Sequence, residues 1–529
     1  MSGPRTLNPL LSKIDTIVIV MMENRSFDHM LGYLSLPGNS YRRRIEGLRK
    51  VNGRWPAKYG NRYEGQTYFP RYSPGPRIRP DPAHDREAVR DQMHLVGNRY
   101  RMNGFVQNYM DTYRGNEDVD PAAVMRYYTE KELPVFDYFA KNYCVCDKWF
   151  SSLPTSTHPN RLMALCGYTE VDDNIDFPRH TLPRQRFLFD ALPQKIKWRI
   201  YNEDGDVSFF DLLGLFHGYM PKGISMLEDD FNKSDFPQVV WIEPKYTYAY
   251  RIGNDDHPDA SIFEGQLFLG NVYKSLRSDP RRWAKTLLII TYDEHGGFFD
   301  HVVPPKVSTS GNFEPFTTAG LRVPAFLISP YVRAGVPFHQ TLDHTCMLDL
   351  IDKRFSLNRY PVDGRGQDLF GSLDDALADA ANFPDTALIR HAMDRISPRA
   401  KHSNYEHAYL AAAKERAQNY VYIGPDFHDH AANILNPRLL GMATDRERRN
   451  VDEALRRKRA VIHTLMTPAL TYTKKRQIAE THAVTTKQLH EDITAVIASA
   501  KLAVKLKPSK ARRTKRSVNA KVTPKKSKH

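Results

Sequence analysis

The chain has 529 residues, of which 41% are hydrophobic and 26% are charged. This is the composition of a globular protein, and it excludes a chain that is disordered or collagen-like throughout. No apolar run approaches the roughly 18 residues of a membrane-spanning helix, which excludes an integral membrane protein. At roughly 100–200 residues per domain, the length allows two or three domains, or one large domain with insertions.

The formal net charge of +15 is concentrated at the C-terminus. Residues 500–529 contain twelve Lys or Arg and no Asp or Glu, so the rest of the chain carries about +3. The tail, residues 501–529, has too few apolar residues to pack, and we expect it to be disordered. An anionic membrane and nucleic acid are alternative partners for this tail, and a solvated tail without a partner is the third possibility.

Cysteine content and the N-terminus indicate the compartment. The four cysteines are too few for a disulfide framework in a chain of this length, so we expect reduced, buried thiols. The N-terminus lacks the apolar segment of a signal peptide, and the apolar run 17–22 is followed directly by charged residues. We therefore expect a cytoplasmic protein, with export that needs no signal peptide as the alternative.

The first predicted element is a strand at 14–22, which is apolar on both faces like an interior strand of a parallel sheet. A short helix is expected to follow it, up to Leu34. Similar apolar runs predict further strands at 197–201, 239–242, 286–292 and 325–329. Helical patterns lie between them at 261–276 and 345–355. This alternation predicts an α/β fold with a mainly parallel sheet.

Two regions depart from the alternation. Residues 41–82 are rich in Arg, Tyr, Gly and Pro and are predicted to form a long surface insertion. Aromatic residues in it could reach a lipid interface or could pack on the body of the protein: Trp55, Tyr59, Tyr63, Tyr68 and Phe69. Beyond about residue 370, helices are expected at 374–396, 404–417, 445–466 and 474–500. We therefore predict a domain at 14–370, a helical region at 371–500 and the basic tail.

Acidic residues follow two of the predicted strands directly. Glu23 and Asn24 end the first strand, and Asp293 and Glu294 end the strand at 286–292. Ligands of open parallel sheets bind just outside the carboxyl ends of the strands, so these side chains are candidates to converge. Three ionised carboxylates share a site only when a cation compensates them. A divalent metal with oxygen ligands is therefore one interpretation, and helix caps and surface ion pairs are the other.

The segment Pro-Thr-Ser-Thr-His-Pro-Asn-Arg at 154–161 predicts a loop that enters a helix, with Pro159 near its first position. Thr157 then lies at the helix N-terminus, where free amides and the helix dipole favour an anion such as phosphate or an alkoxide. The same position suits a nucleophile and a helix cap, and either Ser156 or Thr157 could be that cap. The local sequence does not separate these alternatives.

Three histidines beside these motifs could transfer protons near neutral pH. His84 follows Asp-Pro-Ala, His257 follows Asn-Asp-Asp, and His301 comes eight residues after Asp293. A single histidine in a loop is more often structural or solvated than catalytic. The pair Gly296–Gly297 is expected to allow a close backbone approach beside the site.

Six motifs occur here in one order: Glu-Asn-Arg-Ser-Phe-Asp-His (23–29), Asp-Pro-Ala-His (81–84), Ser-Thr-His-Pro-Asn-Arg (156–161), Asn-Asp-Asp-His-Pro (254–258), Thr-Tyr-Asp-Glu-His-Gly-Gly-Phe-Phe-Asp-His (291–301) and Arg-Val-Pro-Ala-Phe-Leu-Ile-Ser-Pro (322–330). Their order resembles the phosphoesterase family of non-specific phospholipases C and related acid phosphatases, within the alkaline-phosphatase-like superfamily. The resemblance runs from about Ile14 to Phe355.

The resemblance implies an alkaline-phosphatase-like three-layer α/β/α sandwich and hydrolysis of a phosphoester, most simply a phospholipid. It implies one divalent metal ion, and the ligands are Glu23, Asn24, Asp293, Glu294 and Thr157. Thr157 is then also the nucleophile and forms a phospho-threonine intermediate. His84 and His257 line the site, with His257 as the acid for the leaving group, and His301 matches a further motif histidine.

Two features depart from the family pattern. The chain lacks the signal peptide of secreted relatives, and helical segments stand where the large phospholipases carry C-terminal β domains. The substrate therefore stays open between phospholipase C action and phosphomonoester hydrolysis. A third hypothesis is an inactive scaffold that binds polyanions through its tail, although every motif residue is intact. The sequence indicates neither the identity of the metal nor the oligomeric state.

Overall fold

The computed structural model describes residues 8–38, 44–174, 187–202, 209, 221–246, 253–258, 260–309, 313–357 and 370–401. The helices expected at 404–417, 445–466 and 474–500 and the basic tail at 501–529 lie outside these residues. Within the described ranges, no helix combines the length and the hydropathy that crossing a bilayer requires.

A seven-stranded sheet forms the centre of the molecule, in the order β10-β9-β11-β1-β12-β13-β8. The strands are β1 (Thr16–Met22), β8 (Cys144–Val145), β9 (Trp198–Asn202), β10 (Lys222–Gly223), β11 (Val239–Ile242), β12 (Thr286–Tyr292) and β13 (Ala325–Ile328). All pairings from β10 to β12 are parallel, whereas β13 runs antiparallel to β12 and to β8. The five predicted strands and the mainly parallel sheet are therefore confirmed.

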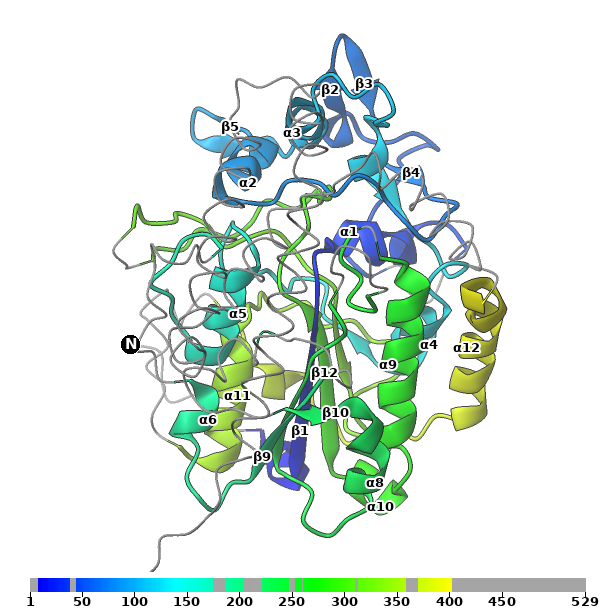
Figure 1. Cartoon of the computed structure of the whole chain (residues 1–529), viewed down its shortest axis with the longest axis vertical. Coiled ribbons are helices and arrows are strands. Elements are labelled where there is room, and N and C mark those ends of the chain that lie inside the picture. Colours follow the sequence, from blue (N-terminus) through cyan, green and yellow to red (C-terminus); the bar gives the residue numbers. More distant parts are fainter. Residues whose placement is uncertain are drawn as a thin grey trace, which may run out of the picture.

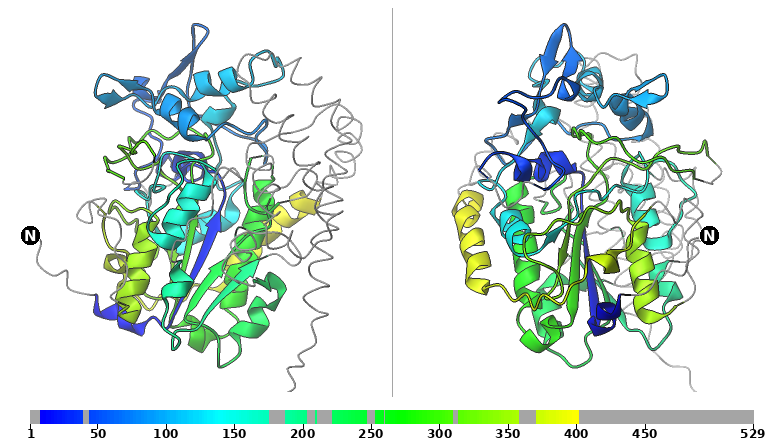
Figure 2. Two further views of the ribbon diagram at one scale, coloured as in Figure 1. Left: turned by 60° about the vertical axis from the view of Figure 1, so that its left-hand side comes forward. Right: turned by 180° about the vertical axis from the view of Figure 1, so that it is seen from behind.

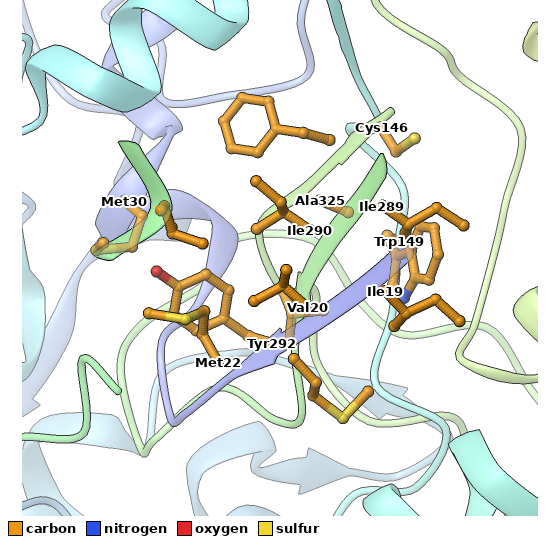
Figure 3. Packing of buried hydrophobic residues seen from close by; sticks show 14 of the residues in the cluster. Ile19, Val20, Met22, Met30, Cys146, Trp149, Ile289, Ile290, Tyr292 and Ala325 are labelled. Carbon is orange, nitrogen blue, oxygen red and sulfur yellow. The ribbon is translucent and has the colours of Figure 1, made fainter. Parts of the chain in front are cut away.

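Strands β1 and β12 lie side by side and are buried along their whole length. Their register pairs Thr16 with Thr286 and Met22 with Tyr292, so both strands end at the same level. Figure 3 shows the alternation of their side chains, with Ile19 near Trp149 on one face of the sheet. Because helices cover both faces, both sets of side chains must be apolar.

Helices pack on both faces of the sheet and give three layers (Figures 1 and 2). One face carries α4 (Pro134–Asn142), α9 (Ile262–Leu276) and α12 (Thr386–Lys401), which contact one another. The other face carries α5 (Thr157–Cys166) and α11 (Thr345–Phe355), which also contact each other. The predicted helices at 261–276 and 345–355 and the three-layer α/β/α arrangement are confirmed.

The helix expected at 374–396 is wrong in its first half. The structure has a short 3₁₀ turn, η7 (Leu373–Ala376), and then non-helical chain until α12 begins at Thr386. Pro384 explains the difference, because a proline disfavours helical backbone at the residue before it. Ile389 and Ile396 of α12 are buried in the same hydrophobic core as the sheet. The described chain beyond 370 thus packs on the α/β body, and the domain boundary near 370 stays a prediction.

Residues 44–129 lie above the carboxyl end of the sheet as a cap (Figure 1). Its elements are η4 (Ala57–Tyr59), β2 (Asn61–Tyr63), β3 (Gln66–Tyr68), β4 (Arg71–Tyr72), α2 (Arg86–Met93), β5 (Leu95–Val96), β6 (Arg99–Tyr100), α3 (Phe105–Thr112), η5 (Ala123–Met125) and β7 (Arg126–Tyr127). Of the insertion aromatics, Tyr59 is buried, and Trp55, Tyr63, Tyr68 and Phe69 are half-buried against the core. The alternative that these rings pack on the body is therefore the one that holds.

The remaining elements are short: η1 (Pro9–Lys13), α1 (Phe27–Met30), η2 (Gly32–Ser35), α6 (Leu188–Ala191), η6 (Ile224–Met226), α8 (Leu227–Phe231) and α10 (Pro280–Trp283). The four cysteines are buried and form no disulfide, as expected: Cys144, Cys146, Cys166 and Cys346.

Candidate active site

The chain segments that follow β1 and β12 are joined by hydrogen bonds. The Asp293 amide donates to the Met22 carbonyl at 3.1 Å, and the Asn24 amide donates to Asp293 Oδ1 at 3.0 Å. Asn24 has a φ of 58°, a left-handed conformation that asparagine tolerates better than most residues. A Cβ at Gly296 would lie 2.0 Å from the Asn24 carbonyl oxygen, so only glycine fits there. The expected close approach beside the site is confirmed.

Arg161, on α5, binds three buried carboxylates. Its Nη2 lies 2.6 Å from Glu23 Oε1, its Nη1 lies 2.8 Å from Glu243 Oε1, and its Nε lies 3.4 Å from Asp293 Oδ2. Burial raises the pKa of Glu23 well above its usual range, the Asp293 charge adds to this shift, and Arg161 opposes it. Burial likewise raises the pKa of Glu243 against the opposing charge of Arg161. The positive charge of the guanidinium group therefore stabilises these buried carboxylates close to one another.

Thr157 is the first residue of α5, four residues before Arg161, and such pairs share one face of a helix. The preceding Ser156 makes no capping hydrogen bond with its side chain and donates instead to Asp173. The Thr157 hydroxyl oxygen is buried and has no hydrogen-bond partner among the described residues. The alternative that Ser156 or Thr157 caps the helix through its side chain does not hold.

Among the described residues, the buried oxygen atoms of this region that make no hydrogen bond include Asn24 Oδ1, Thr157 Oγ1 and Asp293 Oδ2. Asp293 Oδ2 has only its ion contact with Arg161. Buried polar atoms are normally hydrogen-bonded, so such exceptions require an explanation. A hard divalent cation binds carboxylate, amide and hydroxyl oxygens, and this donor set therefore fits the metal ion that the family resemblance implies.

His84 orients the Asn24 side chain. Its Nδ1 lies 2.8 Å from the Pro82 carbonyl, which only accepts, so this nitrogen carries the proton. Its Nε2 then accepts from Asn24 Nδ2 at 3.1 Å. The Asn24 amide is thereby held with its nitrogen toward His84 and its oxygen available to a ligand.

His257 lies next to His84, with 6.0 Å between the ring centroids. Its Nδ1 lies 3.0 Å from the Pro258 carbonyl, and its Nε2 lies 3.9 Å from Asp81 Oδ2. Asp81, His84 and His257 are buried and offer ligand atoms within 4.8 Å of one another, so this group could hold a metal ion.

The structure places His301 in a different group, with Asp28 and Asp300. His301 Nδ1 lies 2.6 Å from Asp28 Oδ2, and Arg322 contacts both aspartates at 3.0 and 2.9 Å. Burial alone lowers the pKa of His301, but the Asp28 charge and the hydrogen bonds to Asp28 and Glu46 together outweigh burial and raise this pKa to about 9. No contact between His301 and the other predicted site residues is found in the described chain. These contacts favour a structural role, and the part of His301 in the reaction stays a prediction.

Two further histidines support the site and are neutral. Burial lowers the pKa of His295 to about 3, and its Nε2 donates to Gln92 Oε1 at 2.8 Å. Burial also lowers the pKa of His344. Trp149 donates to His344 Nδ1, so Nε2 carries the proton and donates to the Asp293 carbonyl at 2.6 Å. His344 thus fixes the backbone that carries Asp293.

The motifs of the sequence alone assign no role to Arg161, Glu243 or Asp81. Glu243 follows β11 directly, so the rule that singled out Glu23 and Asp293 also applies to it. Arg161 could have been found from its spacing to Thr157, since the two share a helix face. Asp81 stands in the same short motif as His84, but no local pattern indicates that it faces His257.

Comparisons with known proteins identify the family of this chain. The model of the Phosphoesterase family matches residues 14–358. Non-specific phospholipase C3 of Arabidopsis thaliana is 31% identical over 389 residues, which cover 66% of this chain and 71% of that protein. Phospholipase C A of Mycobacterium tuberculosis is 29% identical over 398 residues, which cover 66% of this chain and 74% of that protein.

Among solved structures, a protein of the alkaline phosphatase superfamily from Vibrio parahaemolyticus is similar, with a TM-score of 0.27 and 12% identity over 48% of this chain and 65% of that one. This likeness is partial and adds nothing to the match in sequence. The match of the family model over most of the chain and the identity to the plant phospholipase decide the assignment. The chain belongs to the Phosphoesterase family and is a phosphoric ester hydrolase.

Proposed function

We propose that the protein cleaves phospholipid head groups as a metal-dependent phospholipase C, through a phospho-threonine at Thr157. The observation that carries this proposal is the Thr157 hydroxyl, which is buried at the first residue of α5 and makes no hydrogen bond with the described part of the chain. A hydroxyl without a partner is available to attack phosphorus. The names of the plant and mycobacterial relatives support a phospholipid as the substrate.

In the first step Thr157 loses its proton to water, and its oxygen attacks phosphorus in line with the departing diacylglycerol oxygen. The new bond joins Thr157 Oγ1 to phosphorus, and the bond from phosphorus to the diacylglycerol oxygen breaks. His257 donates a proton to this departing oxygen. Asp81 Oδ2 lies 3.9 Å from His257 Nε2, the nitrogen that would carry this proton.

In the second step water attacks phosphorus, and the bond to Thr157 Oγ1 breaks. His257, now neutral, accepts the proton of the water, and the threonine oxygen regains a proton. The products are the phosphorylated head group and the free enzyme. Two displacements of this kind replace one difficult step by two easier ones.

The residues that would hold a divalent metal ion are Glu23, Asn24, Asp293, Glu294 and Thr157. Such an ion, when bound, lowers the pKa of the Thr157 hydroxyl and screens the charge of the phosphate. Arg161 keeps Glu23 and Asp293 beside each other, and His84 keeps the Asn24 amide oriented. The proposal gives no step to His301.

A substrate panel tests the proposed function. We expect purified full-length protein to hydrolyse phosphatidylcholine and p-nitrophenyl phosphorylcholine faster than p-nitrophenyl phosphate, and we expect a chelator to remove all three activities. Faster turnover of the monoester would identify a phosphomonoesterase instead. Turnover of none of the three, with metal supplied, would favour the inactive scaffold.

Metal content tests the proposed ligands separately. We expect Asp293→Asn to lower both the metal bound after dialysis and the rate, because it removes one negative ligand. Asp300→Asn is the matched control, since it makes the same change at a buried aspartate of the other cluster, and we expect it to retain metal. Equal metal content in the two variants would contradict the assignment of Asp293 as a ligand.

A further inference from the structure

The β5–β6 hairpin projects from the cap into open space. Leu95 pairs with Tyr100 and Val96 pairs with Arg99, and a two-residue turn joins the strands. Gly97, in this turn, has a φ of 60°, and a Cβ added there would meet no atom within 4 Å. The tip of the hairpin is therefore free of contacts with the rest of the described chain at this position.

Apolar side chains are exposed on this hairpin. Leu95 is 51% exposed and Val96 is 44% exposed. Successive residues of a strand point to opposite faces, so neither face of the hairpin covers its aliphatic side chain. A single two-stranded hairpin is marginally stable in water, and exposed leucine and valine do nothing to stabilise it. Both side chains are therefore accessible to a surface outside the molecule.

Basic side chains flank the apolar tip. Arg99 and Arg101 are exposed, and the described residues provide neither with an ion pair. By contrast, Arg90 of the preceding helix α2 pairs with Asp91 at 3.3 Å. Aliphatic side chains between unpaired guanidinium groups complement an anionic bilayer, which offers an acyl boundary below negative head groups. Nucleic acid would use the arginines but not the leucine and valine.

The root of the hairpin adjoins the candidate active site. Gln92, three residues before Leu95, accepts a hydrogen bond from His295 at 2.8 Å, and His295 is next to Glu294 in the chain. The return strand is tied to the same helix, since the Arg101 amide donates to the Met93 carbonyl at 3.2 Å. Figure 1 shows α2 and β5 above the carboxyl end of the sheet. A surface that binds the hairpin is thereby brought to the end of the molecule that holds the candidate site.

We propose that the β5–β6 hairpin docks the enzyme on anionic phospholipid bilayers, with Leu95 and Val96 in the acyl boundary and Arg99 and Arg101 on the head groups. This proposal rests on the proposed function, because docking on a phospholipid bilayer brings the substrate to the enzyme only if the enzyme is a phospholipase. The aromatic residues of the insertion pack on the body of the protein. The proposed lipid contact is therefore made by the aliphatic side chains at the tip of the hairpin instead.

Vesicles of phosphatidylcholine with phosphatidylserine test the docking on the full-length protein. We expect Leu95→Ser combined with Val96→Ser to lower co-sedimentation about tenfold, while hydrolysis of soluble p-nitrophenyl phosphorylcholine is unchanged. Arg99→Ser and Arg101→Ser should each lower it about fivefold at low salt and less at high salt. Met226→Ser is the matched control, since Met226 is 42% exposed and directly precedes α8 at the opposite end of the sheet (Figure 1), and it should change neither assay.

A position-specific probe separates the hairpin from any binding by the basic tail. We expect the added fluorescence of Leu95→Trp to be quenched by brominated phosphatidylcholine, and that of Met226→Trp to be unaffected. Unchanged vesicle binding of the double variant, or absence of quenching at position 95, would overturn the docking proposal. Loss of a DNA gel shift in the arginine variants with unchanged vesicle binding would overturn it as well. Quenching at 95 in a protein that hydrolyses no phospholipid would leave the docking standing and refute the proposed function.

Discussion

Two acidic clusters follow the same two strands, and they differ in how their charge is balanced. After β1 and β12 come first Glu23 and Asp293, and a few residues later Asp28 and Asp300. In the later cluster Arg322 and a protonated His301 supply two positive groups for the two buried carboxylates, and His301 also contacts the half-buried Glu46 at 3.3 Å.

In the first cluster one guanidinium group, that of Arg161, contacts three buried carboxylates of the described chain, those of Glu23, Glu243 and Asp293. This cluster also contains buried oxygen atoms without hydrogen bonds, on Asn24 and Thr157 among others. A cluster whose positive and negative charges compensate each other stabilises the fold. A cluster with an excess of negative charge and with oxygens that lack hydrogen bonds can bind a cation and a substrate. Acidic residues after a strand are therefore common to both clusters, and the number of cations distinguishes them.

Removing the hydroxyl of the first cluster should have the largest effect. We expect Thr157→Ala to lower kcat on the order of 10⁴-fold or more and to leave the fold intact, because the covalent nucleophile is lost. Ser156→Ala is the neighbouring control and should keep most of the activity. Acid quench with labelled substrate checks the intermediate, and phosphate on a residue other than Thr157 would refute the assignment.

His257, the predicted acid, and His301, the further motif histidine, should separate the clusters by substrate dependence. We expect His257→Ala to lower turnover of substrates with basic leaving groups by about 10²–10⁴-fold and to affect p-nitrophenyl esters little. His301→Ala should lower the turnover of all substrates by the same factor, because less of the protein is folded. Rate against leaving-group pKa is the measurement. A parallel loss in both variants would remove His257 from the acid role.

Breaking the balanced cluster should show in stability. We expect Arg322→Leu to lower the free energy of unfolding by about 3–5 kcal/mol, since two buried carboxylates lose their shared partner. Denaturant titration measures this free energy. The amount of metal bound per folded molecule should be the same in the variant as in the wild type. A loss of metal without a loss of stability would reverse the roles that we give to the two clusters.

The same cluster predicts a pH dependence of stability. The pKa of His301 is raised from 6.5 to about 9 in the folded state, so its protonated form stabilises the fold. This contribution, about 3 kcal/mol, is fully present below about pH 6.5 and is lost as the pH rises through about 9. Unfolding titrations between these pH values should show that the free energy of unfolding of the wild type falls as the pH rises. The same free energy should depend less on pH in His301→Gln. Equal slopes in the two proteins would mean that another group titrates.

Much of the fold could be predicted because each central strand carries its own apolar run and directly precedes its acidic residues. The predictions of β1, β12, α9 and α11 rest on local pattern alone. Strand direction has no such signal, so the antiparallel course of β13 could not be predicted from four apolar residues. The two-residue strands β8 and β10 are too short to form a pattern at all.

The candidate site was predictable in part for the same reason. Glu23, Asn24, Asp293 and Glu294 were found from strand ends, but their compensation by Arg161 depends on how α5 packs against the sheet. Likewise, the separation of His301 from His257 depends on which carboxylates fold against each. Motif order identifies the residues of this chemistry, and only the packed structure shows which charges are already neutralised.

The paired ends of β1 and β12 also make the site sensitive to errors of folding. Met22 lies opposite Tyr292, and the next residue of each strand supplies a carboxylate. A shift of one residue between these strands would move the two carboxylates apart by about 3.3 Å and turn alternate side chains to the wrong face. A misaligned chain would therefore separate Glu23 from Asp293, two of the proposed metal ligands. If these residues bind a metal as proposed, metal retention on a purified sample also reports the fraction of correctly aligned molecules.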